Sequence, residues 1–407
     1  MIPKGWERRP IKDLCESIID CVNKTAKHVD YVTPYKMIRT TNVRNGRVDT
    51  SSVRYVTKEV YSQWIRRGAP QQGDIIFTRE APVGEVGILE DPVGVFLGQR
   101  TMTYRSHPKK SNNQFLLYSL LSSYCQKQIE DFSNGGTVAH MRVPDCGEII
   151  INAPPLPEQR QIAQILSTWD KAIVTTEKLI AASQQQKKAL MQQLLTGKKR
   201  FAGFSEEWER YSLGNLVFID KKSIGKSTPK DFSFRYISLS DVSAGVINNN
   251  LKVHQFMSAP SRARRMVQIG DILFSTVRPN LQGFSIISEA YSDCIASTGF
   301  SVLTPKQNVC GNYIYQCLFS YDITTQIDAL VVGSNYPAIN SSDVKELKIY
   351  CPNYPEQQKI AAVLTAADQE IDALQSKLAH LKQEKKALMQ QLLTGKRRVV
   401  LEAETSL

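Results

Sequence analysis

Apolar residues recur in alternating steps of four and three along two long stretches of the chain, at residues 157–200 and 355–398. Such spacing is typical of a helix that packs along a second helix, as in a coiled coil sustained over about four heptads. The seam in the first stretch is interrupted by Thr176 and Ser183, and each stretch has one seam lysine, Lys187 or Lys385. The predicted seam positions are Ile162, Leu166, Trp169, Ile173, Ile180, Leu190 and Leu194, then Ile360, Leu364, Ala367, Ile371, Leu374, Leu378, Leu381, Leu388 and Leu392.

The two stretches are copies of one another at a constant offset of 198 residues, and Lys187–Lys198 is letter-for-letter identical to Lys385–Lys396. A proline in the first turn starts each predicted helix, and Gly197 or Gly395 followed by basic residues ends it. At about 1.5 Å per residue each helix would span roughly 55 Å. One helix alone cannot bury its apolar stripe, so the natural partner of each copy is the other.

The segments that precede the helices also repeat. GWE at residues 5–7 corresponds to EWE at 207–209, GDIIF at 73–77 to GDILF at 270–274, and Gly46 to Gly245. Asn45–Gly46 is typical of a tight turn between strands, and 112–132 and 311–328 have helical spacing. We therefore predict an α+β protein with an internal duplication: domains at 1–152 and 201–352, helices at 153–200 and 353–398, and a tail at 399–407.

The two predicted domains share several motifs at matching positions, but their sequences differ between these motifs. Hardly a letter matches between Gly46–Gly73 and Gly245–Gly270. Two copies of one scaffold with different polar faces suit the recognition of two different half-targets.

Composition narrows the class of partner. The 407-residue chain carries a formal charge of +12, so an anionic partner comes first, and its 42% apolar content excludes a disordered protein. There is no apolar run near 18 residues and no apolar leader core, which favours a cytoplasmic protein without a membrane span. The eight cysteines are scattered and contain no C-x-x-C pair, which favours reduced thiols over zinc ligands or disulfides.

Several motifs resemble the specificity (S) subunit of type I restriction–modification systems over essentially the whole chain. They are PPLPEQ at 154–159, LLTGKKR at 194–200, the two GDI-x-F strands and the tryptophan-containing starts, in duplicate and in order. The resemblance implies two mixed α/β target recognition domains related by a pseudo-twofold duplication, with the two helices as an antiparallel coiled-coil spacer. It further implies a bipartite double-stranded DNA target with an unread gap.

The same resemblance implies partner subunits. Two methyltransferase (M) subunits would dock on the helices, and restriction (R) subunits would join the full complex. S-adenosylmethionine, ATP and Mg²⁺ are expected on those partners, and this chain is expected to bind no cofactor or metal of its own.

Polar side chains in the predicted loops support DNA reading, because Arg and Asn can make bidentate contacts to purine edges. The basic groups Arg262, Arg264, Arg265 and Lys221, Lys222 are expected at phosphates if they touch DNA. The candidate DNA-contacting residues are Arg39, Asn42, Arg44, Asn45, Arg79, Thr137, His140, Arg142, Arg235, Ser240, Arg278, Asn280, Ser334, Asn335 and Tyr336.

Two other classes of function remain as alternatives. Asp328, Glu346 and Lys348 are reminiscent of a metal-dependent nuclease, although the first half lacks the lysine. A coiled-coil adaptor without a nucleic-acid role is the second alternative. IGKS at 224–227 lacks the first glycine of a phosphate loop, because residue 220 is Asp. A non-catalytic DNA-specificity scaffold is therefore the preferred hypothesis.

Overall fold

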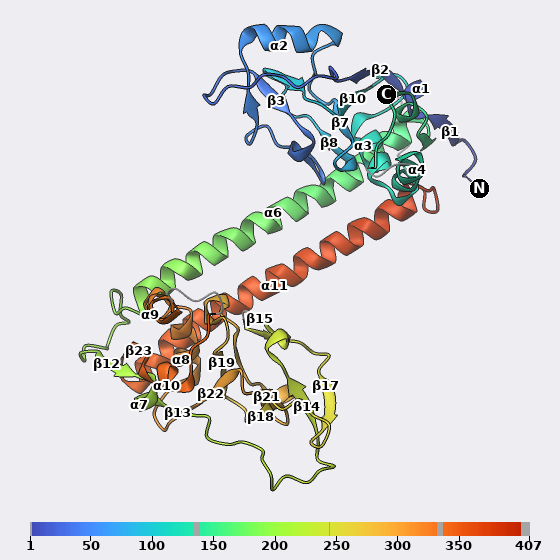
Figure 1. The fold of residues 1–407 in the computed structure, drawn as a ribbon. Coiled ribbons are helices and arrows are strands. Elements are labelled where there is room, and N and C mark those ends of the chain that lie inside the picture. The colour runs from blue at the N-terminus through green and yellow to red at the C-terminus, as the bar shows by residue number, and fades with distance from the viewer. Residues whose placement is uncertain (1, 134–138, 244, 332–336, 400–407) are drawn as a thin grey trace, which may run out of the picture. The chain divides into compact units, whose positions relative to one another are not determined.

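The computed structural model describes residues 2–133, 139–243, 245–331 and 337–399. Two compact units account for its internal contacts (Figure 1). Unit 1 comprises residues 1–177 together with 376–407, and unit 2 comprises residues 178–375. Unit 1 is therefore discontinuous in sequence, whereas unit 2 is continuous.

Unit 1 is built around a six-stranded mixed sheet in the order β2-β10-β7-β8-β5-β4. A three-stranded sheet, β6-β3-β9, and the pair β1-β11 accompany it. The elements are β1 (Glu7–Pro10), α1 (Ile11–Leu14), β2 (Cys15–Asp20), β3 (Lys36–Ile38), η1 (Thr40–Asn42), β4 (Val43–Arg44), β5 (Gly46–Val48), β6 (Arg54–Tyr55), α2 (Lys58–Trp64), η2 (Ile65–Arg67), β7 (Ile75–Arg79), β8 (Val83–Ile88), β9 (Val95–Leu97), β10 (Thr101–Ser106), α3 (Asn113–Leu121), α4 (Ser123–Ser133), α5 (Val143–Cys146) and β11 (Ile150–Ala153).

Unit 2 follows a similar order of elements, although two strands take the place of β6, α2 and η2. Its sheets are β13-β22-β19-β20, β17-β14-β21-β18, β15-β16 and β12-β23. The elements are β12 (Glu209–Ser212), α7 (Leu213–Leu216), β13 (Val217–Ile219), β14 (Ser233–Ile237), η3 (Leu239–Asp241), β15 (Val242–Ser243), β16 (Val246–Ile247), β17 (Lys252–Gln255), β18 (Ala263–Met266), β19 (Ile272–Ser275), η4 (Pro279–Leu281), β20 (Phe284–Ile286), η5 (Glu289–Tyr291), β21 (Ile295–Ser297), β22 (Phe300–Pro305), α8 (Gly311–Leu318), α9 (Tyr321–Val331), α10 (Ser341–Glu346) and β23 (Lys348–Cys351).

The two long helices, α6 (Leu156–Leu194) and α11 (Tyr354–Leu392), both pass through the two units. In unit 1 the first part of α6 packs with the last part of α11, and in unit 2 the last part of α6 packs with the first part of α11. Within unit 1, Asp170 pairs with Lys385 and the later Glu177 pairs with the earlier Lys382, so the helices run antiparallel there.

The predicted packing of the two long helices against one another is confirmed, and their ends are also parts of the domain cores. Near the helix ends, seam residues such as Leu166 and Leu392 are fully buried in the core of unit 1, against α3 and β11. Along the middle, Ile173, Ile180 and Ile371 are buried and the remaining seam residues are half-buried. Trp169, Leu190, Ala367, Leu374, Leu378, Leu381 and Leu388 form that half-buried set.

The local predictions for the first domain are also confirmed, with added detail. The predicted helix at 112–132 is a pair, α3 and α4, because Ser122 adopts an extended conformation between them. Asn45 and Gly46 both have positive φ and form the tight turn that links β4 to β5. All eight cysteines are free, and burial raises the pKa of Cys15 and Cys125 to about 12.

Candidate nucleic-acid interface

Several polar loops of unit 1 meet at one end of its six-stranded sheet, which we call the β7 end: Glu80–Pro82, Arg100 and His140. Strand β7 finishes at Arg79, while its antiparallel neighbours β8 and β10 begin at Val83 and Thr101. The loops that join these strands must therefore lie side by side. His140 reaches the same place through a β-bridge to Glu80.

Three residues of the predicted DNA-contacting set take part in internal contacts of unit 1. Asn42 is buried, accepts the backbone N–H of Arg39 and donates to the Ser52 carbonyl, so it closes the η1 turn. Arg79 is also buried and lies 3.0 Å from the Asp20 carboxylate. Arg39 is partly buried, and its pKa is lowered first by that burial and then by the nearby charge of Arg54. These placements favour a structural role for Asn42 and Arg79 over a role in DNA contact.

Other members of the predicted set are exposed. Arg44 ends β4 and Asn45 follows it in the β4–β5 turn, where the Asn45 N–H donates to Glu85. His140 and Arg142 are exposed, and Arg142 pairs with Asp145 one turn away in the chain. Thr137 lies outside the described residues. The exposed side chains are the ones that a ligand could contact without unfolding the domain.

The β7 end also holds two charged residues that the sequence did not single out. Glu80 Oε1 lies 3.2 Å from Arg100 Nη1, and Glu80 Oε2 lies 3.3 Å from His140 Nδ1. The only sequence signal is that Glu80 follows GDIIF, whereas Val277 occupies the corresponding position after GDILF. No local sequence pattern shows that Arg100, twenty residues further along the chain, lies beside Glu80.

In unit 2 the turn after β19 and the segment around η3 and β15 line a groove of about 390 Å³. Ser240 and Ser243 come from the segment around η3 and β15, and Arg278 and Leu281 from the turn after β19. Arg278 has φ +50° and Gln282 φ +52°, a left-handed conformation that is costly for residues other than glycine. Three predicted residues, Ser240, Arg278 and Asn280, are thus exposed near one another.

The remaining predicted residues of unit 2 are placed elsewhere or lie outside the description. Arg235, on β14, pairs with Asp293 and donates to the carbonyl of Ala290. Ser334, Asn335 and Tyr336 lie outside the described residues. The basic residue Arg265 pairs with Asp220, and Arg264 lies over the ring of Phe256.

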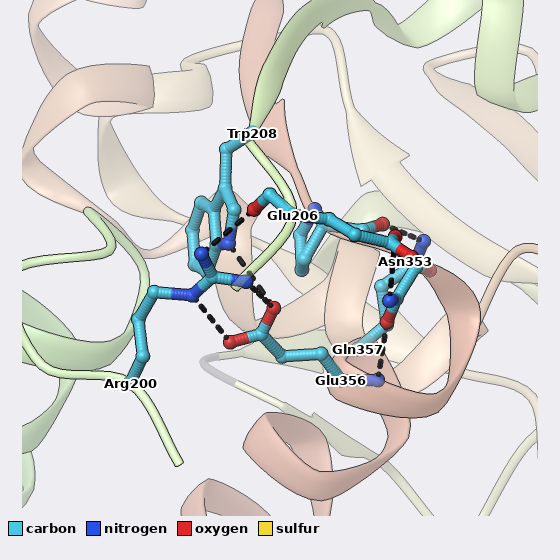
Figure 2. A network of polar contacts seen from close by, with 7 residues as sticks. Arg200, Glu206, Trp208, Asn353, Glu356 and Gln357 are labelled. Carbon is cyan, nitrogen blue, oxygen red and sulfur yellow. Dashed lines mark hydrogen bonds and ion pairs between the residues drawn. The ribbon is translucent and has the colours of Figure 1, made fainter. Parts of the chain in front are cut away.

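A second polar site is formed around the glutamate of each PEQ motif. At the start of α11, the buried Glu356 carboxylate accepts hydrogen bonds from the Arg200 guanidinium at 2.7 and 3.0 Å and from the Trp208 indole at 3.2 Å (Figure 2). Asn353 caps the same helix by accepting the Glu356 N–H, and it donates to Glu206. We call Arg200, Trp208 and Glu356 the unit 2 clamp.

Unit 1 contains the same clamp made from the other copy of each residue. Arg398 donates to Glu158 at 2.6 and 3.0 Å, and the Trp6 indole donates to it at 3.2 Å. Glu158 and Glu356 are both buried, so each carboxylate depends on its two donors. The clamps fasten the start of one long helix to the segment that follows the end of the other.

The comparisons with known proteins agree with this duplicated architecture. The family model described as "Type I restriction modification DNA specificity domain" matches residues 3–183 and again 205–383. The chain therefore belongs to the type I restriction–modification DNA specificity family. As a specificity subunit it has two target recognition domains and is a non-catalytic component of the enzyme, so the nuclease alternative is set aside.

Individual relatives match along nearly the whole chain. A putative type I restriction enzyme MjaX specificity subunit from Methanocaldococcus jannaschii is 28% identical, covering 98% of this chain and 95% of that protein. The EcoKI specificity subunit of Escherichia coli K12 is 23% identical, covering 69% and 63%. The crystal structure of an S subunit from M. genitalium has a TM-score of 0.61 at 19% identity, covering 96% of each chain, and thus shares the fold.

Two further observations concern ligands and membranes. Across the described ranges, no group of three or more His, Cys, Asp or Glu side chains is arranged to hold a metal ion. Asp328, Glu346 and Lys348 are all exposed, on α9, α10 and β23. Among the helices that the structure describes, none has both the length and the apolar content that a membrane crossing needs.

Proposed function

We propose that each recognition domain reads one half of a bipartite double-stranded DNA target and that α6 and α11 set the distance between the half-sites. The observation that carries the proposal is the pairing of a common framework with different polar loops. At the β7 end, unit 1 has Glu80, Arg100 and His140, whereas unit 2 has Val277, Gly299 and Ala338 at the corresponding backbone positions. Equal frameworks with unequal loops suit two independent readers.

The DNA contacts in this proposal come mainly from exposed residues. Arg44, Asn45, His140 and Arg142 in the first domain, and Ser240, Arg278 and Asn280 in the second, would contact bases or phosphates. The net charge of +12 supports a phosphate-dominated affinity that falls with salt.

The long helices would also dock the catalytic partners. The segment Lys187–Lys198 is identical to Lys385–Lys396, including exposed residues such as Lys188 and Gln192 that the seam does not use. Identity on an exposed face supports two copies of one partner, which we propose are methyltransferase subunits. S-adenosylmethionine would bind there, and ATP and Mg²⁺ on restriction subunits of the full complex.

A domain exchange tests the division of labour. Residues 201–352 are replaced with the second domain of another specificity subunit, and the recognised sequence is mapped by methylation in the presence of the methyltransferase partner. One half-site should change while the other stays the same. A simultaneous change in both would show that the domains do not read independently.

Partner dependence is tested separately. The purified chain alone should transfer no methyl group to DNA, and activity should appear when a separate S-adenosylmethionine-binding subunit is added at two copies per chain. Methyl transfer by the highly purified chain alone would refute the proposed assembly.

A further inference from the structure

The Glu80 carboxylate of unit 1 is flanked by two cationic or potentially cationic groups in a position open to a ligand. Its two oxygens lie 3.2 Å from Arg100 Nη1 and 3.3 Å from His140 Nδ1. The side chains of Arg100 and His140 are 49% and 43% exposed, while that of Glu80 is 19% exposed. The carboxylate is therefore held in place by neighbours that solvent, or DNA, can still reach.

The duplicated framework does not need these three side chains. In unit 1, Arg79 donates its N–H to Arg100 O and accepts from Met141 N, and in unit 2, Thr276 does the same with Gly299 and Ile339. The bridge between Glu80 and His140 is likewise repeated by Val277 and Ala338. These backbone contacts are thus formed in unit 2 with a valine, a glycine and an alanine where unit 1 has Glu80, Arg100 and His140.

The backbone at this site is also strained. Arg100 has φ +69°; Ala81, next to Glu80, has φ +51°, a conformation that Arg278 repeats in unit 2 with φ +50°. Residues with side chains are uncommon in this left-handed region, and such strain persists mainly at functional sites. In unit 2 the matching backbone contact is made by Gly299, whose φ is not positive, so the left-handed conformation of Arg100 is not repeated there.

We propose that Glu80 and Arg100 read one G·C base pair in the half-site of the first domain, with His140 as the positioning residue for Glu80. The inference rests on the proposed function, in which this domain reads one half-site. In the major groove a G·C pair presents the N4 donor of cytosine beside the O6 and N7 acceptors of guanine. An ionised carboxylate only accepts, and a guanidinium only donates, so the adjacent Glu80 and Arg100 complement that edge.

The chemistry of the two side chains favours a G·C pair over an A·T pair. Carboxylates characteristically accept from cytosine N4, and arginine characteristically donates to guanine O6 and N7. An A·T pair would offer the arginine a single O4 acceptor beside a thymine methyl group, which is a poorer match. His140 holds the second carboxylate oxygen, while the first, 3.2 Å from Arg100 Nη1, keeps a lone pair that can accept from a base.

The test uses variants that copy the second domain: Glu80→Val, Arg100→Gly and His140→Ala. The full chain, assembled with its methyltransferase subunits, selects sites from a DNA library that is randomised in both half-sites. Each of the first two variants should lose about tenfold or more of its preference for G·C at one position of one half-site. The other half-site should be unchanged. Because unit 2 folds with these residues, thermal unfolding should be unaffected, or shifted upward for Arg100→Gly.

A fourth variant, Glu80→Gln, separates charge from shape. Its carboxamide can still accept from cytosine N4 but can also donate to thymine O4, so the affected position should widen from cytosine to cytosine or thymine. His140→Ala should weaken the same preference without replacing it by another, and a His140→Gln variant, which can still donate to Glu80, should restore part of it.

The outcomes are distinguishable. If the unaltered protein selects no bipartite site, the proposed function fails. If it selects one and the Glu80 and Arg100 variants keep every base preference, the reading role is overturned. Loss of affinity for all sequences together with a lower unfolding temperature would also overturn it, because the side chains would then be structural.

Discussion

Lys385 places its ammonium 2.6 Å from the Asp170 carboxylate on the seam between the long helices in unit 1. The other Asp170 oxygen accepts the Tyr118 hydroxyl at 2.6 Å. Burial and the neighbouring carboxylate raise the pKa of Tyr118 well above its ordinary value, so the phenol remains a donor. The duplicated copy is Lys187 with Asp368, where Gln316 takes the place of the tyrosine. Each seam lysine therefore has a fixed carboxylate partner.

Lys385→Met should lower the unfolding free energy of unit 1 by about 1–2 kcal/mol, because it leaves a partly buried carboxylate without its cation. Combining it with Asp170→Leu should recover most of that loss. Denaturant unfolding of the two single variants and the double variant measures the coupling. As a control, Lys187→Met combined with Asp170→Leu should be additive within about 0.5 kcal/mol, since those residues are not partners. Additivity for the true pair would contradict the seam contact.

Arg200→Ala should destabilise unit 2 by about 3 kcal/mol, because the buried Glu356 would keep only the Trp208 donor. Trp208→Phe, which removes only the indole N–H, should cost about 1.5–2 kcal/mol. The matched control is Lys199→Ala, an exposed neighbour that should change stability by less than about 0.5 kcal/mol. Calorimetry of the full chain provides the measurement, and equal effects for Arg200 and Lys199 would argue against the clamp.

Arg278→Ala should weaken binding to target DNA by about 1–3 kcal/mol if the arginine reads a guanine edge. If it contacts a phosphate, affinity should fall on all sequences and the salt slope should flatten by about one unit. Arg39→Ala is expected to follow one of these two patterns. Arg79→Ala should weaken DNA binding and also lower the unfolding free energy, because Asp20 loses an ion-pair partner. DNA titrations at several salt concentrations distinguish the cases; an unchanged affinity and slope for Arg278→Ala would remove it from the interface.

Lengthening both helices should change the spacing of the recognised half-sites. One heptad inserted into α6 and one into α11, at matched seam positions, preserves the apolar stripe and adds about 10 Å of helix. At about 3.4 Å per base pair this corresponds to roughly three more unread base pairs. Those base pairs also rotate the second half-site, so affinity should fall while the half-site sequences stay the same. Selection from libraries with variable spacing tests this, and an unchanged preferred spacing would mean that the helices do not set it.

The duplication, the long helices and their seam could be predicted from the sequence because each is a periodic or repeated signal. Trp6 and Trp208 could also be aligned from the sequence, but the glutamate that each of them contacts could not be predicted. Trp208 donates to Glu356, 148 residues further along the chain, and no local pattern specifies such a contact.

The candidate site was predicted less completely, for the same reason. Asn42 and Arg79 have the side chains of DNA readers, yet Asn42 closes a local turn with Arg39, and Arg79 pairs with Asp20 only when distant strands come together. Glu80 and Arg100 were missed because their significance lies in a comparison of three-dimensional neighbours. The GDI-x-F repeat aligns Val277 with Glu80, but only the folded framework shows that Gly299 and Ala338 take the places of Arg100 and His140.

The discontinuity of unit 1 has a consequence for the order in which the chain folds during synthesis. Domains usually fold as the ribosome releases them, beginning with the first. Here the core of unit 1 includes Leu392 and Leu393, and its clamp needs Arg398, which is 240 residues beyond Glu158. Unit 2 has all of its residues once Gln375 has emerged. The domain that is translated first is therefore completed last, and until then its unfilled core is the surface most exposed to chaperones and proteases.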